Sequence, residues 1–361
     1  MSSKFYSLTI LTVEQLTDDA IAITFDVPSH LQEKFSFKQG QHLTLKAMIN
    51  EREVRRSYSI CSSVVEQQLQ IAIKHIEGGS FSTFANNEFK EGMAVEVMPP
   101  QGHFFTELSP QSKNNYLFIA VGSGITPIIS HIQSIIAVEK NADVTLIYGN
   151  KTPASTMFDD KLTLISQANA ERFKQINIYS QAQQVNELLN GRICTQKIID
   201  FNTAALINIS SFTDVFLCGP PSMITELITC LKTYGVTDEN IFYELFYLDA
   251  SDKAANEVDL PSSVENDTLS RVTVTSNSSS TTLLISKIGD NILDATIDQG
   301  ADLPFACKVG VCASCKAKVM QGDVKMDVNH SLTEEEVEEG FILVCQSHPV
   351  SDEVAIDFDF D

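Results

Sequence analysis

Hydrophobic and polar residues follow three different patterns along the chain, and the first covers residues 1–110. There, short apolar runs recur between Gly, Pro and Asn turns at regular intervals. Many short strands with such turns are typical of a closed barrel or a sandwich. The predicted strands are Ser7–Val13, Ile21–Val27, His42–Ala47, Leu69–His75 and Ala94–Met98. We therefore predict a β-barrel domain over residues 1–110.

The second pattern, over residues 115–247, alternates predicted strands with predicted helices. The run Tyr116–Val121 is apolar throughout, as expected for a parallel strand that is buried on both faces. The helical pattern Ile128–Ala137 follows it. Later strands are expected at Val144–Tyr148, Ile176–Tyr179 and Val215–Leu217. This alternation predicts an α/β domain built on a parallel sheet.

The third part begins with a polar stretch, residues 248–270, which has no apolar period and which we interpret as an interdomain linker. Residues 271–361 are predicted to form a further small domain. A hairpin, a short helix and a closing strand are expected at Arg271–Thr275 with Thr281–Ser286, at Ile292–Asp298 and at Val354–Phe358. The acidic run Glu334–Glu339 is predicted to be a solvated face.

Four cysteines of this third part have the spacing of an iron–sulfur site. Cys307, Cys312 and Cys315 follow a C-x4-C-x2-C pattern, and Cys345 comes later, after an apolar run that predicts a strand. This is the plant-type pattern for a [2Fe–2S] cluster, in which we expect a tight loop to point its backbone N–H groups at the sulfurs. The alternative is a structural zinc site, because four thiolates also form a tetrahedral cage. Zinc ribbons usually use paired C-x2-C knuckles, and this chain has only one such pair.

One stretch of the predicted barrel suits a ligand that carries phosphates. Arg55 and Arg56 precede Tyr58, and adjacent arginines beside an aromatic residue suit a phosphate clamp next to a flat ring system. Alternation in a strand puts Arg56 and Tyr58 on one face, and Ser57 and Ser59 on the other. The alternative is a pair of surface arginines beside a barrel tyrosine.

Two glycine-containing stretches lead into predicted helices. Gly78 and Gly79 precede the helix-compatible Thr83–Phe89, so they either expose backbone N–H donors to an anion such as a pyrophosphate or form a plain turn. In the second part, the strand Tyr116–Val121 runs into Gly122-Ser123-Gly124-Ile125-Thr126-Pro127 and then into a helix. Strand, glycine loop and helix form the phosphate-binding arrangement of dinucleotide folds. Pro127 stands where a third glycine would be expected, and proline suits the first helical turn.

Length and charge restrict the function further. The 361 residues suffice for two or three domains, and a net charge of −22 argues against a nucleic-acid partner. Residues 251–361 carry 7 Lys and Arg against 21 Asp and Glu. Such a surface either keeps the protein soluble or docks to a basic patch on a partner. Because no leader pattern opens the chain and no apolar run approaches the roughly 20 residues that cross a bilayer, we expect a soluble, cytoplasmic protein.

The arginine–tyrosine–serine motif and the first glycine stretch together resemble the flavin-binding pair of the ferredoxin–NADP reductase superfamily. The matching residues are Arg56-x-Tyr58-Ser59 and Gly78-Gly79-x-x-Ser82. The resemblance implies that Arg56 holds the flavin phosphates, that Tyr58 lies against the isoalloxazine ring and that Ser59 bonds near its reactive nitrogen. It also implies that Gly78, Gly79 and Ser82 receive the pyrophosphate of FAD.

The second glycine stretch and a later Cys218-Gly219-Pro220 resemble the nicotinamide-nucleotide domain of the same superfamily. The resemblance implies a nucleotide cradle made by Gly122, Gly124, Thr126 and Pro127. It also implies that Cys218, with Gly219 and Pro220, lies beside the nicotinamide ring; by itself Cys218 would be a buried cysteine at a strand end. Glu244 and Phe246 resemble the closing Glu-x-Phe element, where the acid can relay a proton and the aromatic ring covers the flavin.

The nucleotide preference stays open. NADP-preferring relatives often carry Ser-Arg near the position of Ser180, whereas the next residue here is Gln181. Lys151 or Arg192 remains to meet the 2′-phosphate of NADPH. The resemblance implies NADPH, and these residues leave NADH open.

The order of the domains resembles the reductases that supply electrons to bacterial oxygenases. It comprises an FAD-binding β-barrel domain (1–110), an α/β parallel-sheet NAD(P)-binding domain (115–247), a linker (248–270) and an α+β, β-grasp ferredoxin domain (271–361). The resemblance implies FAD, NADPH or NADH, and a [2Fe–2S] cluster on the four cysteines. The implied partner is the di-iron oxygenase component of a multicomponent monooxygenase, with an aromatic-ring or steroid hydroxylase as the alternative. A redox sensor is an alternative of another class, but a sensor would not need a nucleotide site.

Overall fold

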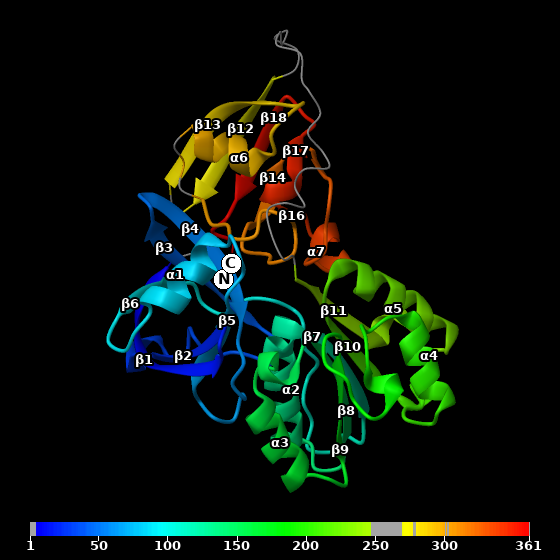
Figure 1. Ribbon diagram of the computed structural model, residues 1–361. Coiled ribbons are helices and arrows are strands. Elements are labelled where there is room, and N and C mark those ends of the chain that lie inside the picture. Colours follow the sequence, from blue (N-terminus) through cyan, green and yellow to red (C-terminus); the bar gives the residue numbers. More distant parts are fainter. Residues whose placement is uncertain (1–4, 247–268, 277–278, 300, 302, 361) are drawn as a thin grey trace.

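The computed structural model describes residues 5–246, 269–276, 279–299, 301 and 303–360 of the 361-residue chain. These residues form three lobes, which Figure 1 colours from blue through green to yellow and red. Each lobe is built on its own main sheet. The predicted linker, residues 248–270, lies outside the described residues except for its last two, which open strand β12.

The N-terminal lobe is an antiparallel β-barrel. Its strands lie in the order β4-β3-β6-β1-β2-β5, and an isolated bridge between Ile60 and Ile71 joins the two ends of the sheet. Alternate residues such as Leu8, Ile23 and Leu45 are buried in its core, because successive side chains of a strand face opposite sides. The elements are β1 (Tyr6–Thr17), β2 (Ala20–Asp26), β3 (His42–Ile49), β4 (Arg52–Ser59), β5 (Leu69–Lys74), α1 (Ser80–Glu88) and β6 (Ala94–Val97). The predicted barrel is confirmed.

The second lobe is built on a parallel sheet, as predicted, and carries helices on both faces. The strand order is β11-β10-β7-β8-β9, so the chain starts in the middle, winds outward to β9, and then returns and winds outward to β11. Helices α2 and α3 pack on one face, and α4 and α5 on the other. The order reverses between β7 and β10, which is where ligands bind in such sheets, at the carboxyl ends of the strands. The elements are β7 (Asn115–Val121), α2 (Ile125–Val138), β8 (Asp143–Asn150), α3 (Asp159–Ala168), β9 (Phe173–Tyr179), α4 (Thr195–Thr203), β10 (Asp214–Gly219), α5 (Pro221–Thr233) and β11 (Ile241–Leu245).

The C-terminal lobe has a β-grasp layout. Its main sheet has the order β13-β12-β18-β14-β16, and the last strand, β18, lies parallel to β12 and antiparallel to β14. The predicted hairpin, helix and closing strand are all present. The elements are β12 (Leu269–Ser276), β13 (Ser279–Ser286), α6 (Ile292–Asp298), β14 (Lys316–Gln321), β15 (Val324–Met326), α7 (Glu334–Glu338), β16 (Phe341–Leu343), β17 (Ser347–Pro349) and β18 (Glu353–Asp357).

Short 3-10 turns connect several of these elements. They are Ser29–Leu31, Gly122–Gly124, Pro153–Ser155, Glu187–Leu189, Ile209–Ser211, Asp238–Asn240 and Val344–Gln346. Within the described part of the chain, no helix is long and apolar enough to cross a membrane.

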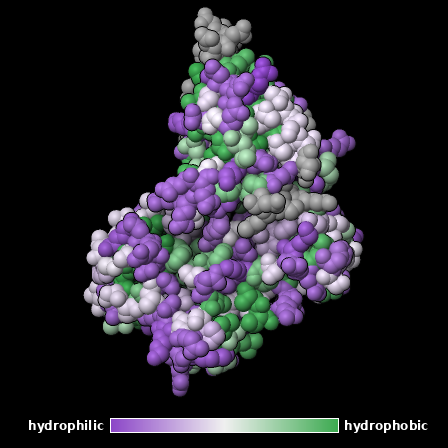
Figure 2. Space-filling model, turned by 180° about the vertical axis from the view of Figure 1, so that it is seen from behind, coloured by the Kyte–Doolittle hydropathy of each residue, from purple (hydrophilic) through white to green (hydrophobic). Residues whose placement is uncertain are grey.

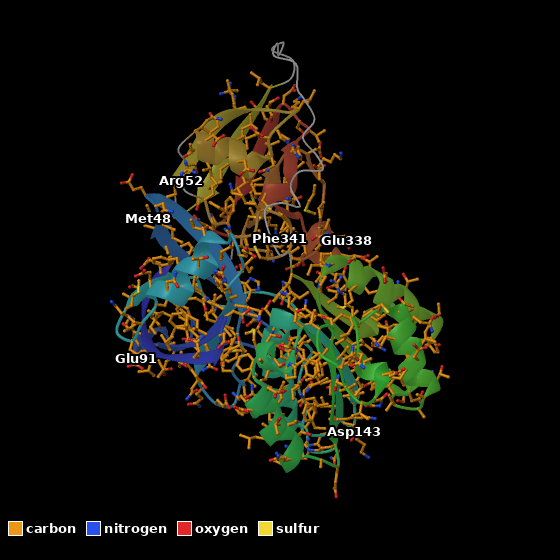
Figure 3. All side chains as sticks on the ribbon, in the orientation of Figure 1. Met48, Arg52, Glu91, Asp143, Glu338 and Phe341 are labelled. Carbon is orange, nitrogen blue, oxygen red and sulfur yellow. The ribbon has the colours of Figure 1, made fainter. Side chains whose placement is uncertain are left out.

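The barrel contacts its two neighbours through different kinds of surface. One hydrophobic cluster combines Cys61 and Phe104 of the barrel side with Ile128 and Phe216 of the parallel-sheet lobe. The cluster inside the C-terminal lobe contains only residues of that lobe. In Figure 3, Asp143, the first residue of β8, lies at the end of the sheet far from the C-terminal lobe, so the carboxyl ends of the strands point toward the junction of the three lobes. Figure 2 shows hydrophilic side chains along much of the border of the C-terminal lobe.

Two local expectations need correction. Helix α2 begins at Ile125, earlier than predicted, because Gly122–Gly124 already forms a 3-10 turn that leads into it. In the acidic run, Glu336 is not solvated, since it pairs with Lys316 Nζ at 2.5 Å and its side chain is only 15% exposed. The other carboxylates of the run are exposed.

Candidate functional site

Strand β4 presents two different faces, as its alternation predicts. Tyr58 packs against Phe81 of α1, with the ring centroids 5.7 Å apart, and Arg56 is exposed. Ser57 and Ser59 lie on the other face, where each forms a hydrogen bond outside β4. We call this second side the serine face of the barrel.

Arg55 does not join Arg56 in a phosphate clamp, contrary to the expectation from their adjacency. It is 4% exposed, and its guanidinium donates to the carbonyl of Leu303 at 2.6 Å and to Glu53 at 2.7 Å. The ring of Phe305 lies 4.6 Å from the guanidinium carbon. Arginine suits this position because its planar fork can bond and stack at the same time. Arg55 therefore joins the barrel to the C-terminal lobe.

The first glycine stretch leads into α1. The N-cap residue of this helix is Gly79, which has no side chain with which to cap the first N–H groups. The hydroxyl of Ser82 is used inside the turn, where it accepts a bond from the backbone N–H of Ile76 at 3.1 Å. Gly78, Gly79 and Ser82 thus shape one compact turn at a helix N-terminus, which is a favourable place for a pyrophosphate.

The second glycine stretch lies at the switch point of the parallel sheet. Gly122–Gly124 connects β7 to α2, and the Thr126 hydroxyl closes the turn by donating to one of its carbonyls at 3.0 Å. A Cβ atom on Gly124 would lie 2.4 Å from the carbonyl oxygen of Cys218. Only glycine therefore lets β10 approach the loop this closely.

Two helix N-termini lie side by side at this point. Pro127 is buried in the first turn of α2, and Pro220 is the N-cap residue of α5. The strands that precede these helices, β7 and β10, are hydrogen-bonded neighbours. Neither N-cap residue, Gly124 or Pro220, caps its helix with a side chain, so the N-termini of both helices are favourable places for the phosphates of a nucleotide.

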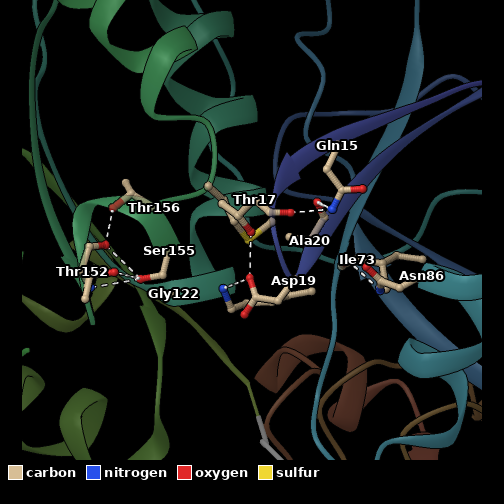
Figure 4. Close-up of polar contacts among 12 residues, drawn as sticks. Gln15, Thr17, Asp19, Ala20, Ile73, Asn86, Gly122, Thr152, Ser155 and Thr156 are labelled. Atoms are coloured by element: carbon tan, nitrogen blue, oxygen red, sulfur yellow. Dashed lines mark hydrogen bonds and ion pairs between the residues drawn. The ribbon is translucent and has the colours of Figure 1, made fainter.

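A further turn shapes the end of β8 (Figure 4). Thr152 and Ser155 form a reciprocal capping box in which the Ser155 hydroxyl accepts from the backbone N–H of Thr152 at 3.1 Å. The same hydroxyl also donates to the Thr152 carbonyl at 2.9 Å. Lys151 directly precedes this turn. Arg192 lies two residues after Asn190, which forms an isolated β-bridge with Tyr179, the last residue of β9. Both side chains are exposed. Two cations therefore lie beyond the carboxyl ends of β8 and β9.

Residues of the barrel and of the parallel-sheet lobe meet where β10 and β11 end. Cys218 and Glu244 are neighbours across this parallel pair, and Ser59 Oγ donates to Glu244 Oε2 at 3.3 Å. The backbone N–H of Phe246 donates to the carbonyl of Gly219 at 3.2 Å. The fold thus brings together residues that the sequence places far apart.

Burial sets the protonation of these groups. Burial raises the pKa of Glu244 to about 8, and the nearby Cys312 adds to the rise although the bond from Ser59 opposes it. Burial lowers the pKa of His42 to about 4 and raises the pKa of the Cys218 thiol well above its usual value. His42 Nδ1 lies 3.9 Å from Glu244 Oε1. Because both side chains are neutral near pH 7, this is a polar contact rather than an ion pair.

The cysteine loop, residues 307–315, lies against β3 of the barrel. His42 Nε2–H donates to the carbonyl of Cys312 at 3.0 Å, and Thr44 Oγ1 lies 2.9 Å from Ser314 Oγ. These bonds bring the loop next to the serine face and to Glu244.

Inside the loop, backbone N–H groups point at sulfur atoms, as the spacing predicts. The N–H of Cys307 lies 3.4 Å from Cys312 Sγ, and that of Val309 lies 3.4 Å from Cys307 Sγ. Cys345 lies in the 3-10 turn after β16, and its thiol interacts with those of Cys307 and Cys315. Contact with the Cys307 thiol, followed by burial, raises the pKa of Cys312 well above its usual value. Thiolates held this close need the positive charge of a metal centre.

The cysteine loop contains a turn that requires glycine. Gly310 has a φ of +78°, and a Cβ atom there would lie 3.1 Å from the carbonyl of Val328. The thiol of Cys312 contacts that of Cys307, and the thiol of Cys345 contacts those of Cys307 and Cys315, which fits a binuclear cluster that divides four thiolates between two irons.

Comparison with known proteins agrees with the three lobes. Residues 7–106 match the family described as oxidoreductase FAD-binding domain, residues 118–228 the oxidoreductase NAD-binding domain, and residues 274–350 the 2Fe-2S iron-sulfur cluster binding domain. The chain is 41% identical, over 98% of both chains, to a subunit of 1,2-phenylacetyl-CoA epoxidase from Escherichia coli (strain K12). The chain belongs to the ferredoxin reductase family with a C-terminal 2Fe-2S domain.

Other members of this reductase family match over the same length. The ferredoxin reductase component of 3-ketosteroid-9-alpha-monooxygenase from Rhodococcus rhodochrous is 27% identical, over 99% of this chain and 97% of that protein. The solved structure of phthalate dioxygenase reductase, described as modular for electron transfer from pyridine nucleotides to [2Fe-2S], is 23% identical over 98% of each chain, with a TM-score of 0.57. That likeness shows the fold. As a member of this family, the chain is an oxidoreductase with FAD-, NAD- and 2Fe-2S-binding domains.

Sequence reasoning missed His42 and Thr44 and gave Arg55 the wrong partner. A signal for the first two exists, because they alternate in the predicted strand His42–Ala47 and must share a face. Nothing in the sequence indicates that this face meets the cysteine loop.

Proposed function

We propose that this chain is the NAD(P)H-dependent reductase component of a multicomponent monooxygenase. We further propose that it serves the di-iron oxygenase of a phenylacetyl-CoA epoxidase complex in phenylacetate degradation. The observation that carries this proposal is the 41% identity to the epoxidase relative over 98% of both chains. The contacts that link the serine face, Glu244 and the cysteine loop support it, because they bring all three domains to one junction.

The proposed domains are an FAD-binding domain at residues 1–110, an NAD(P)-binding domain at 115–247 and a ferredoxin domain at 271–361. Residues 248–270 would be the linker. When bound, FAD accepts a hydride and gives up its two electrons singly, and the cluster carries one electron at a time. Each NAD(P)H that is oxidised would therefore reduce the partner by two single-electron transfers.

The barrel residues would hold FAD. Arg56 is exposed and available to bind phosphate oxygens, and Tyr58 is held in place by Phe81 at the edge of the barrel core. Gly78, Gly79 and Ser82 would bring the N–H groups of α1 to the pyrophosphate.

The parallel-sheet residues would hold the nucleotide. Its phosphates would lie at the N-termini of α2 and α5, which are shaped by Gly122, Gly124, Thr126, Pro127, Gly219 and Pro220. Lys151 or Arg192 would meet a 2′-phosphate, and their exposure is consistent with binding either NADPH or NADH.

Four residues would act where the nucleotide and the flavin meet. Glu244 would hold a proton near neutral pH, and Ser59 would connect it to the flavin side of the barrel. Cys218, a neutral buried thiol, would line the nicotinamide site, and Phe246 would cover the flavin. Cys307, Cys312, Cys315 and Cys345 would hold the two irons.

Anaerobic titration of the purified protein with NADPH, and separately with NADH, tests the reductase proposal. Visible absorption should show bleaching of the flavin, and electron paramagnetic resonance should show a reduced [2Fe–2S] signal. The nucleotide that reduces the flavin faster identifies the preference. An absent iron–sulfur band, with zinc found by metal analysis, would refute the proposal.

The partner is tested separately. The reduced protein is mixed with a purified phenylacetyl-CoA oxygenase component, and formation of the epoxide is measured. A steroid-hydroxylating oxygenase is the second candidate, favoured by the match to the 3-ketosteroid-9-alpha-monooxygenase reductase. Product formed only with the steroid oxygenase would replace the first partner by the second.

A further inference from the structure

His42 links residues of all three lobes through its own contacts. It belongs to the barrel, its Nδ1 atom lies 3.9 Å from Glu244 of the parallel-sheet lobe, and its Nε2 atom lies 3.0 Å from the carbonyl of Cys312. Glu244 in turn accepts the bond from Ser59. His42 therefore stands between the junction where flavin and nucleotide are proposed to meet and the loop that is proposed to hold the cluster.

The backbone of His42 is held on two sides. It exchanges two hydrogen bonds with Gln101, at 2.9 and 3.0 Å, and it lies opposite Ser59 in the β3–β4 pair. The side chain is 4% exposed, and a Cβ atom on Gly102 would come within 3.0 Å of its Nδ1 atom. The imidazole thus has little room to move.

The contact with the cysteine loop has a defined register. His42 and Thr44 are alternate residues of β3 and share a face, and they bond Cys312 and Ser314, which are also two residues apart. The carbonyl of Cys312 can only accept, so Nε2 of His42 carries the hydrogen. Arg55, which donates to the carbonyl of Leu303, adds a third point. Three points fix the orientation of a rigid body, so these bonds together define how the C-terminal lobe lies on strands β3 and β4 of the barrel.

We propose that β3 is the docking strand for the cysteine loop, and that His42 is the positioning residue that holds Cys312 in place for electron transfer from the flavin to the cluster. This proposal rests on the proposed function. In it, His42 would gain and lose nothing, because the one electron that the bound flavin gives up would be the one that the bound cluster accepts. While the C-terminal lobe is docked on the barrel, the Nε2–H bond would hold the ligand loop at a fixed separation from the flavin domain.

The test compares His42→Phe, which keeps a ring but removes the donor, with His42→Gln, which restores an N–H at the position of Nε2. His30→Gln is the matched control, because His30 is an exposed barrel histidine. The full-length protein, loaded with FAD and iron, is mixed anaerobically with NADH or NADPH in a stopped-flow instrument. Flavin reduction and cluster reduction are followed at separate wavelengths. Hydrogen exchange of the amides in residues 303–315 is measured in parallel.

We expect His42→Phe to slow cluster reduction about tenfold or more while flavin reduction changes little, since small misplacements cost large factors in rate. Exchange in residues 303–315 should accelerate by a similar factor. His42→Gln should recover most of both effects, and His30→Gln should match the wild type. Unchanged cluster reduction in His42→Phe, or no recovery in His42→Gln, would overturn the proposal.

A second pair of variants keeps the proposal testable if His42→Phe does not retain its cofactors. Thr44→Val removes the bond to Ser314, and Thr273→Val removes a similar hydroxyl pair, with Thr282, inside the C-terminal lobe. Only Thr44→Val should slow cluster reduction, and equal rates in the two variants would contradict the docking strand. If the wild-type protein itself passes no electron from nucleotide to cluster, the proposed function fails rather than the role of His42.

Discussion

The barrel meets the parallel-sheet lobe and the C-terminal lobe through two surfaces of different chemistry. Toward the parallel sheet, helix α2 is buried along most of its length and shares a hydrophobic cluster with the barrel. Two polar side chains of α2 also form hydrogen bonds to the barrel side. Ser130 Oγ donates to the Ser62 carbonyl at 2.7 Å, and His131 Nε2 donates to the Phe104 carbonyl at 2.7 Å. Toward the C-terminal lobe, the barrel uses hydrogen bonds, an ion pair and the stacked Arg55.

This difference shows how one chain can combine a stable domain interface with one that separates more easily. Burial of apolar surface is the dominant stabilising effect, and water offers apolar groups no substitute for it. Hydrogen bonds between polar groups are exchanged for bonds to water on separation, so each contributes only about 0.5–1.5 kcal/mol net. We infer that the barrel and the parallel sheet stay together as one unit. The C-terminal lobe is expected to separate from the barrel at a lower cost in free energy.

The largest effect is expected from a substitution in the hydrophobic cluster that the barrel shares with the parallel-sheet lobe. Phe216 is fully buried and stacks on Phe118 and Phe242 at 5.1 and 4.7 Å. Phe216→Ala should lower the free energy of unfolding by about 3–5 kcal/mol because it leaves a cavity. Denaturant unfolding, followed by flavin release and by cluster absorption, should show loss of flavin at lower denaturant while the cluster is retained. Phe358→Ala, in the core of the C-terminal lobe, should show the reverse, and a common transition in both variants would contradict two separate units.

The next test uses the protonation of Glu244, which lies where the two surfaces meet. Its pKa is about 8 in the folded protein against a usual 4.5, so the folded state binds the proton more tightly. The stability that this proton contributes is complete below pH 4.5 and is lost as the pH rises through 8. The free energy of unfolding of the wild type should therefore fall between about pH 5 and 9, and Glu244→Gln should reduce this fall by on the order of 3 kcal/mol. Unfolding midpoints at several pH values measure it, with the exposed Glu239→Gln as control; parallel curves for wild type and Glu244→Gln would refute the assignment.

A smaller effect is expected from Arg55→Lys, which keeps the charge but loses the planar fork and the stack on Phe305. Docking of the C-terminal lobe should weaken by about 1–2 kcal/mol. Amide exchange in residues 303–315 should accelerate accordingly, without a change in flavin binding. Arg172→Lys is the matched control, because Arg172 also bonds backbone carbonyls, those of Ile136 and Glu139, but lies wholly within the parallel-sheet lobe. Equal exchange in the two variants would show that Arg55 does not hold the lobe.

The smallest effect is expected at the outer ion pair. Glu336 lies 3.4 Å from His103 Nε2 of the barrel side and also pairs with Lys316. Because the barrel-side partner His103 is 41% exposed, Glu336→Gln should weaken docking by only about 0.2–1 kcal/mol, and high salt should reduce the difference. Exchange of residues 303–315 at low and high salt measures it. Asp352→Asn, which breaks the exposed pair with Lys287 inside the C-terminal lobe, is the control. A loss as large as that of Arg55→Lys would mean that charge, rather than the stacked arginine, holds the lobe.

The separable surface is also the part of the site that sequence reasoning described least well. Arg55 and Arg56 are adjacent and chemically identical, so the sequence suggested one shared task. A strand turns consecutive side chains to opposite sides, which sends Arg55 to Leu303 and leaves Arg56 exposed. Glu336 shows the same limit, because five similar carboxylates in one short run look alike until the fold brings a lysine and a histidine beside one of them.

Local features were predictable because they depend on near neighbours. The period of two in the barrel strands, the continuous apolar run before Gly122 and the spacing from Cys307 to Cys315 each determined an element or a loop without reference to distant residues. The conformation of the cysteine loop followed as well, since tight turns and N–H groups directed at sulfur are properties of a short segment.

By itself, the sequence determined the three sheets, the order of the domains and the residue types that suit flavin, nucleotide and cluster. Those depend on local periodicity and on motifs a few residues long. The tertiary structure alone decided that Ser59, Glu244, His42 and Cys312 form one connected junction. It also decided that the barrel shares a hydrophobic core with one neighbour and meets the other through polar contacts and a stacked arginine. The physical reason is that these contacts join residues up to 270 positions apart, and no local pattern records which surfaces will meet.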